Sequence, residues 1–397
     1  MVPLSNECFF EILKYLENNY KSLFSCLLIN RQWFRLVVPI LWSKPLNHFF
    51  DSRIIRIYLS FLNSDEQIPL IPLKFKLPIY QKKPLVDYTI FIISFQDDLL
   101  SESIIEWIIR EGHDPQDYHY ITPNMVQVVK CSLIAMLLRK SEKLKSIDIH
   151  GFTHGIFVKT LVETLYRNTT IKDISIHSAE LGFNDVKSLA NALIKNNTLN
   201  SLKIGYDLIG DHGKLLIEAL HENTTISSLS LYYLRLDHES IKAISNVLLE
   251  NSTLVSLDLH DLSYNQLGIE GGKAISNALW KINSTITYLN LGDISRNEID
   301  SEEGIALAWA LRSNSSLTSL DLSIGEFGSE KVVRAIIKSL RKNISLTSLN
   351  FHYSDFDFNG SDDDSDELDL SLFRNINVLL GNLRKDIRKD IEISFGL

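Results

Sequence analysis

The chain has 397 residues, 45% of them apolar and 22% charged, which is ordinary for a globular protein and excludes fibrous and wholly disordered classes. No uncharged apolar run approaches the roughly 18 residues that a membrane-spanning helix needs. Glu7 and Glu11 interrupt the apolar start that a secretory signal would require. Cys8, Cys26 and Cys131 have no metal-ligand spacing. We therefore expect an intracellular protein, in the cytoplasm, the nucleus or both, with no membrane partner.

The net charge of −9 argues against a nucleic-acid partner, because phosphates must be neutralised by Lys and Arg. Most of the acidic excess lies within residues 355–369, and the remainder of the chain sums to about −1. We interpret this acidic segment as a solvated insertion between the last two repeats described below. Ser361 and Ser365 are each followed by acidic residues, so regulation by phosphorylation is the alternative interpretation.

The first forty residues predict three short amphipathic helices. Their apolar positions recur at helical spacing and are Ile12, Leu13 and Leu16, then Leu23, Leu27 and Leu28, then Trp33, Leu36, Val37 and Leu41. All of these side chains could simply form a core, and we favour that interpretation for Trp33 and Leu36. A module of this size seldom buries a self-sufficient core, so we expect it to need a partner.

The same segment carries a family pattern: Leu4-Ser-Asn-Glu7, a Leu-rich middle, Asn30-Arg-Gln-Trp33 and a closing Leu41-Trp42. It closely resembles an F-box, with Ser5 where the family has Pro. The resemblance implies an adaptor that docks onto Skp1, which is bound in turn to a cullin scaffold carrying the RING subunit and the ubiquitin-charged E2. The candidate Skp1-binding residues are Leu4, Ser5, Glu7, Ile12, Leu13, Leu16, Leu23 and Leu27.

Residues 46–140 are predicted to connect this module, residues 1–45, to the rest of the chain. Their pattern predicts a helix over 48–63, an extended proline-punctuated stretch from residue 67 and a first strand at 90–95. Helical spacing returns at 104–109 and 125–137. We interpret this region as degenerate capping repeats, which shield the end of a repeat array.

Residues 141–397 form the repeat array, with the acidic insertion 355–369. The phrase Asn-Thr/Ser-Thr/Ser-Leu-x-Ser-Leu-x-Leu recurs in it about every 27–32 residues, close to the period of leucine-rich repeats. Each unit pairs a period-two Leu-x-Leu strand with an amphipathic helix. The pattern resembles the ribonuclease-inhibitor type of leucine-rich repeat. The predicted fold class is α/β, an all-helical F-box followed by a solenoid with parallel strands inside and helices outside.

Asparagine marks the turn from helix to strand in nearly every repeat. Eight positions formally qualify as N-glycosylation acceptors, namely Asn168, Asn196, Asn223, Asn251, Asn283, Asn314, Asn343 and Asn359. Because all but the last recur at one phase of the repeat, we interpret them as architectural. Asn tolerates left-handed backbone and bonds local amides at such turns.

The middle residue of each Leu-x-Leu should point away from the core and line the concave strand face. In chain order these residues are Asp148, Ser175, Lys203, Ser230, Asp258, Asn290, Asp321 and Asn350. With Tyr232 and His260 just past two strands, they supply the candidate substrate-binding residues: Asp148, Lys203, Tyr232, Asp258, His260, Asn290, Asp321 and Asn350. The excess of acids favours a basic or amide-rich ligand, although a merely solvated face is the simpler interpretation for any single residue.

His150, His177, His260 and His352 also follow repeat strands. We do not expect a metal site there, because adjacent strands stand roughly 5 Å apart whereas ligand atoms must come within about 2 Å of one ion. No phosphate loop or hydrolase motif occurs, so no catalytic residue and no cofactor are predicted.

The favoured function is the substrate receptor of a Skp1-cullin-F-box ubiquitin ligase, with an unknown protein as its target. The alternatives are a repeat protein resembling Ran GTPase-activating proteins, and a Skp1 complex without a cullin.

Overall fold

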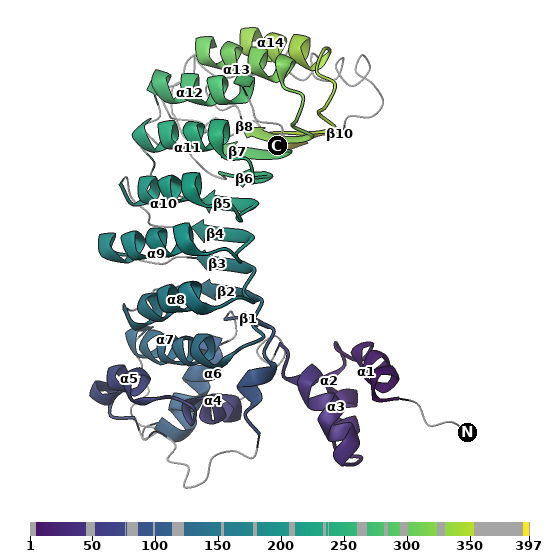
Figure 1. Cartoon of the computed structure of the whole chain (residues 1–397), viewed down its shortest axis with the longest axis vertical. Coiled ribbons are helices and arrows are strands. Elements are labelled where there is room, and N and C mark those ends of the chain that lie inside the picture. The colour runs from purple at the N-terminus through teal and green to yellow at the C-terminus, as the bar shows by residue number, and fades with distance from the viewer. Residues whose placement is uncertain are drawn as a thin grey trace, which may run out of the picture. The chain divides into compact units, whose positions relative to one another are not determined.

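The computed structural model (Figure 1) describes residues 5–44, 52–75, 77, 86–97, 100–112, 123–151, 155–177, 181–205, 211–232, 236, 238–259, 268–281, 285–293, 301–323, 330–352 and 392–396. The chain divides into two compact units, residues 1–179 and residues 180–397. The acidic segment 355–369 and His260 lie outside the described residues. The domain boundaries at residues 45 and 140 stay predictions.

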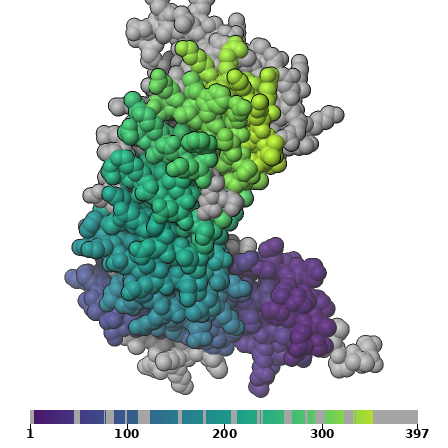
Figure 2. Space-filling model, turned by 45° about the horizontal axis from the view of Figure 1, so that its top comes forward, coloured from purple at the N-terminus to yellow at the C-terminus, as the bar shows by residue number. Residues whose placement is uncertain are grey.

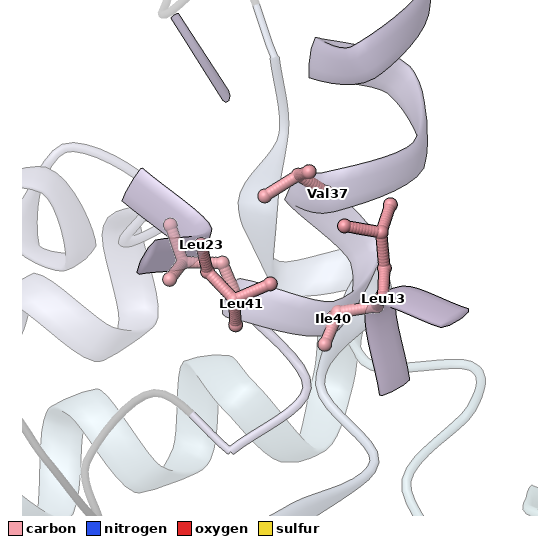
Figure 3. Close-up of a cluster of buried hydrophobic side chains, with 5 residues drawn as sticks. All are labelled: Leu13, Leu23, Val37, Ile40 and Leu41. Atoms are coloured by element: carbon pink, nitrogen blue, oxygen red, sulfur yellow. The ribbon is translucent and has the colours of Figure 1, made fainter. Parts of the chain in front are cut away.

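The first unit begins with the predicted three-helix module: α1 (Asn6–Lys14), α2 (Tyr20–Leu27) and α3 (Arg31–Leu41). Each helix starts at a polar cap, Ser5, Asn19 and Asn30, whose side chain accepts a hydrogen bond from an amide of the first turn. The core consists of Leu13, Leu23, Val37, Ile40 and Leu41 (Figure 3). The helical periodicity in the sequence therefore predicted these helices correctly.

Short helices follow the module. They are α4 (Ser52–Leu59), α5 (Ser64–Gln67) and the 3-10 helices η1 (Ile68–Leu73) and η2 (Tyr88–Phe91). The expectation of an extended stretch from residue 67 was wrong for η1, because the fixed backbone angle of Pro69 and Pro72 suits a 3-10 turn as well as an extended chain. Trp42 stacks on Tyr88 with ring centroids 4.3 Å apart, which joins the end of the module to η2.

The capping region of the first unit has the strand-and-helix plan of the repeats. Strand β1 (Ser94–Gln96) is followed by α6 (Leu100–Trp107), the π-helical turn η3 (Ile108–Gly112) and α7 (Pro123–Lys140). Then come β2 (Ser146–His150), α8 (Gly155–Arg167) and β3 (Asp173–His177). The three strands are parallel, with Gln96 opposite Asp148 and Asp148 opposite Ser175.

The second unit continues the alternation. Its helices are α9 (Phe183–Lys195), α10 (Asp211–Glu222), α11 (His238–Glu250), α12 (Gly268–Lys281), α13 (Ser301–Ser313) and α14 (Glu330–Leu340). Its strands are β4 (Ser201–Gly205), β5 (Ser228–Tyr232), β6 (Ser256–Asp258), β7 (Tyr288–Asp293), β8 (Ser319–Ser323), β9 (Ser348–His352) and β10 (Glu392–Gly396). These strands pair in parallel and in chain order, so the repeats form an α/β solenoid of the leucine-rich type.

The strands and helices of the second unit form two layers, strands on one side and helices on the other (Figure 1). The leucines of each Leu-x-Leu point between the layers and are buried, as Leu229, Leu257 and Leu289 illustrate. Successive helices pack against one another, and the space-filling view shows the described repeats following one another in contact, from teal to light green (Figure 2). Neighbouring repeats thus share one apolar core that no single repeat could bury alone.

The recurring asparagines link each repeat to the one before it. Asn251, for example, is only 7% exposed. Its Oδ1 accepts hydrogen bonds from the backbone amides of Thr253, at 2.9 Å, and Leu254, at 2.8 Å. Its Nδ2 donates to the backbone carbonyls of Leu220, at 2.9 Å, and Asn223, at 3.2 Å, in the preceding repeat. Asn223 and Asn343 make the same four bonds.

The architectural interpretation of these asparagines is supported by their burial, which leaves a side chain such as that of Asn251 little access for a glycan. The left-handed backbone was not found: among the described residues the only non-glycine with positive φ is Lys74. The amide matters because it has both donors and acceptors, so one side chain satisfies backbone groups of two repeats.

Among the described residues, no helix combines the length and the apolar character that crossing a bilayer would require.

Candidate functional site

Two surfaces carry the residues that the sequence singled out, the three-helix module and the strand face. On the module, Ser5 and Glu7 are exposed at the start of α1. Ser5 caps the helix, and its hydrogen bond to Glu7, together with the Glu7 backbone amide, lowers the pKa of that carboxyl. Ile12 is 53% exposed, and Leu4 lies outside the described residues.

The remaining candidates of the module face inward. Leu13 and Leu23 are 2% and 0% exposed in the core of the module, and Leu16 and Leu27 pack against that core. The assignment of Leu13 and Leu23 as surface contacts is therefore corrected, because a side chain that fills the module's own core is not available to a partner. Helical periodicity alone does not distinguish an inward face from a partner-facing one.

Other large apolar side chains of the module are exposed instead. Tyr15, Phe24, Leu28 and Ile29 are 91%, 55%, 67% and 56% exposed. Tyr15 and Leu28 are the C-caps of α1 and α2, Ile29 follows α2, and Phe24 lies within it. Helical spacing gave no signal that separates them from the buried Leu13 and Leu23. The exposure of several large apolar side chains on so small a module is typical of a surface that binds a partner.

On the strand face, the second unit places the predicted row in register. Lys203 lies opposite Ser230, Ser230 opposite Asp258, Asp258 opposite Asn290, Asn290 opposite Asp321 and Asp321 opposite Asn350. Neighbouring side chains interact along the row. Ser230 Oγ donates to Asp258 Oδ2 at 3.1 Å, and Asn350 Nδ2 donates to Asp321 Oδ2 at 2.8 Å. The sequence pattern thus predicted this row correctly, but did not predict the bonds along it.

Tyr232 is less accessible than expected. Its side chain is 7% exposed and lies over Gly205, where a Cβ would meet the ring at 2.0 Å. Lys203 Nζ lies 4.9 Å from the centroid of the same ring. Tyr232 therefore packs on the neighbouring strand and makes a cation–π contact with Lys203. Asn290 is also 7% exposed, so Lys203, Asp258, Asp321 and Asn350 are the more accessible residues of the row.

Tyr288 was missed by the sequence analysis, although it precedes Asn290 by two residues and so shares its face. The pKa of its hydroxyl is raised, first by burial and then by the negative charges of Asp258 and Asp321. The register places Asp258 and Asp321 on the strands on either side of Tyr288, so the two carboxylates flank the same part of the strand face. Their combined field favours a cationic group of a ligand.

The other candidates have different surroundings. Asp148 belongs to the first unit, where His177 Nε2 lies 2.9 Å from its Oδ1. His260 is outside the described residues, and the side chain of His352 is not described.

No family model matches the chain. A stretch of 166 residues is 29% identical to the mouse (Mus musculus) NACHT, LRR and PYD domains-containing protein 12 and covers 39% of the chain. The chain spans only 16% of the length of that relative. Together with the parallel strand-and-helix alternation, this match supports leucine-rich repeats, an architecture whose extended faces serve protein interaction.

Solved structures give more distant likenesses. A Bacteroides fragilis protein matches with a TM-score of 0.41 and 14% identity, over 66% of this chain and 69% of that one. The yeast Rad7–Elc1 complex contains a chain that matches with a TM-score of 0.39 and 18% identity, over 75% and 72%. No conclusion about function follows from scores of this size.

Proposed function

We propose that the chain is the substrate-recognition adaptor of a Skp1-cullin-F-box ubiquitin ligase. In this proposal the three-helix module docks onto Skp1, and the strand face of the repeats holds the target protein. Cullin and RING subunit are reached through Skp1. The chain itself performs no chemistry, and its contribution is to raise the local concentration of target lysines near the charged E2.

The observation that carries the proposal is the contrast within the module. Its own core is complete, with Leu13 and Leu23 buried, yet Ile12, Tyr15 and Leu28 are more than half exposed. In a free protein such side chains lose the free energy that burial would give them, on the order of 1.5–3 kcal/mol for each fully buried aliphatic side chain. This arrangement on an F-box-like sequence fits a module that is completed by a partner.

The strand face fits the second half of the proposal. The row from Lys203 to Asn350 presents polar groups from successive strands at fixed spacing, roughly 5 Å from one strand to the next. The carboxylates of Asp258 and Asp321 stand two strands apart with Asn290 between them. A Lys or Arg of a target protein is the group that this pair would accept.

The test is binding of purified full-length protein to purified Skp1. Ile12→Glu places a charge in the proposed contact and should weaken binding by at least about 30-fold, the effect of losing an interface residue worth roughly 2 kcal/mol. Ile344→Glu is the matched control, because Ile344 is 74% exposed on a repeat. Equal Skp1 affinity of the two variants would refute the docking role of the module.

A further inference from the structure

The strand face of the first unit carries a second cluster of side chains, which the proposed adaptor function does not use. Asp148 and His150 lie on β2, and Ser175 and His177 lie opposite them on β3. These four residues alternate with the buried Ile147, Ile149, Ile174 and Ile176. They therefore share the outward side of the two strands.

The metal-ligating atoms of this cluster converge. One ligand atom each from Asp148, His150 and His177 lies within 4.8 Å of the others. The distance from Asp148 Oδ1 to His177 Nε2 is 2.9 Å, and that from Asp148 Oδ1 to His150 Nδ1 is 3.9 Å. Ligand atoms in a tetrahedral zinc site are about 3.3 Å apart, which follows from bonds of roughly 2.0–2.1 Å. The two measured distances bracket that value.

The sequence argument against a metal used the spacing between strands and ignored the reach of the side chains. An imidazole extends far enough for its ring to cross to the neighbouring strand, and the rings of His150 and His177 stack with centroids 4.1 Å apart. The rings are parallel to within 2°. Because a bound ion lies near the plane of each ligating ring, one imidazole must turn on binding. His150, with 42% of its side chain exposed, has the room to do so.

A buried carboxylate stands behind the cluster. Asp97 is fully buried; its Oδ1 accepts from the His150 backbone amide at 2.8 Å and lies 3.2 Å from His150 Nδ1. Its other oxygen is 2.7 Å from Nζ of Lys130, so the Asp97 charge is already compensated. The nitrogen that faces Asp97 is the same Nδ1 that lies 3.9 Å from Asp148 Oδ1. Once the ring turns, either Nδ1 ligates the ion and gives up its contact with Asp97, or Nε2 ligates the ion and Asp97 orients the ring through Nδ1.

We propose that Asp148, His150 and His177 bind a divalent transition-metal ion, and that zinc is the ion that this donor set fits. Two imidazoles and one carboxylate suit zinc better than magnesium or calcium, which prefer oxygen ligands. Three protein ligands leave one position of a tetrahedral ion for water or for a side chain of a bound protein. The Asp148 and His150 side chains, 26% and 42% exposed, keep that position open on the strand face.

The experiment is calorimetric titration of chelator-treated full-length protein with Zn²⁺ under reducing conditions. We expect one ion per chain in the wild type. His177→Gln should weaken binding at least as much as the loss of an outer partner of a ligand does, about 10–100-fold. His221→Gln is the matched control, because it removes an imidazole that pairs with Glu250 at 2.6 Å on neighbouring helices and should leave the affinity unchanged.

Asp148→Asn, which keeps the shape of the side chain, is the second ligand variant and should also weaken zinc binding. Circular dichroism verifies that the variants fold. A second measurement needs only the wild-type protein: Zn²⁺ should raise its melting temperature and Mg²⁺ should not. Equal zinc affinity of His177→Gln and His221→Gln would place the ion elsewhere, at the cysteines or other histidines, and overturn the proposal. The absence of any zinc-dependent heat or melting shift in the wild type would overturn it as well.

Discussion

The three-helix module and the repeats of the second unit bury their apolar side chains in different ways. Each repeat places its leucines between two neighbours and ties its turn to the previous repeat through a buried asparagine such as Asn251. The module has no such neighbours: it buries Leu23 completely and leaves Leu28 67% exposed. The described repeats therefore share one apolar core, whereas the module leaves large apolar side chains exposed, as its proposed docking onto a partner requires.

The largest expected effect on stability comes from a substitution that unfolds the module and leaves the repeats folded. Leu23→Ala removes a fully buried side chain and should destabilise the module by about 2–5 kcal/mol. For so small a core this is enough to unfold it, while the repeats keep their own transition. Limited proteolysis of full-length protein would show cleavage within residues 5–42. Leu28→Ala, the exposed counterpart, should leave that segment protected.

A second variant breaks the link between repeats. Asn251→Ala leaves four backbone groups without the partners that the amide supplies. We expect a loss of about 3 kcal/mol in the free energy of unfolding of the second unit, since each buried unsatisfied group costs roughly 1–3 kcal/mol and some gain water. Urea unfolding measures the loss. Asn200→Ala, at an exposed position directly before β4, should change it by less than about 0.5 kcal/mol.

The strand face can be tested without disturbing either core. Reversal of both Asp258 and Asp321 to Lys should weaken capture of target proteins about tenfold or more and leave Skp1 binding intact, because the acidic field over Tyr288 is inverted. The control changes the acids of residues 355–369 to Ser, which removes more charge from another segment. Loss of targets with the control variant and not with the reversal would assign recognition to the acidic segment.

The smallest effect concerns an ion pair of the first unit. Burial raises the pKa of Asp87, but its bonds with Lys140 and Thr89 outweigh this and hold the pKa below its ordinary value of 3.8. The carboxylate therefore stabilises the fold above that pH, and its contribution is lost as the pH falls through the lowered pKa. Asp87→Asn should cost less than about 1 kcal/mol at pH 7, as for other partly exposed pairs. Thermal melts of both proteins should converge in acid.

The sequence predicted the helices of the module, the order of the repeats and the polar row on their strands, because each follows from a local periodicity of apolar residues. It did not reveal that Leu13 and Leu23 point inward while Tyr15 and Leu28 point outward, since this depends on how three helices pack. The sequence also drew attention to His150 and His177 and predicted no metal there, but it did not reveal that their side chains converge with Asp148. This convergence depends on rotamers and on Asp97, which is distant in sequence.

The most direct test of the adaptor function is quantitative affinity capture of the tagged full-length protein from cells in which cullin complexes are preserved. The parallel sample is the same chain carrying Ile12→Glu, with Ile344→Glu as the surface control. The account predicts that Skp1 and a cullin accompany the wild type and the Ile344→Glu control in comparable amounts and are lost together from the Ile12→Glu variant. Skp1 without a cullin in the wild-type sample would contradict the ligase function, and Skp1 retained by Ile12→Glu would contradict the assigned docking surface.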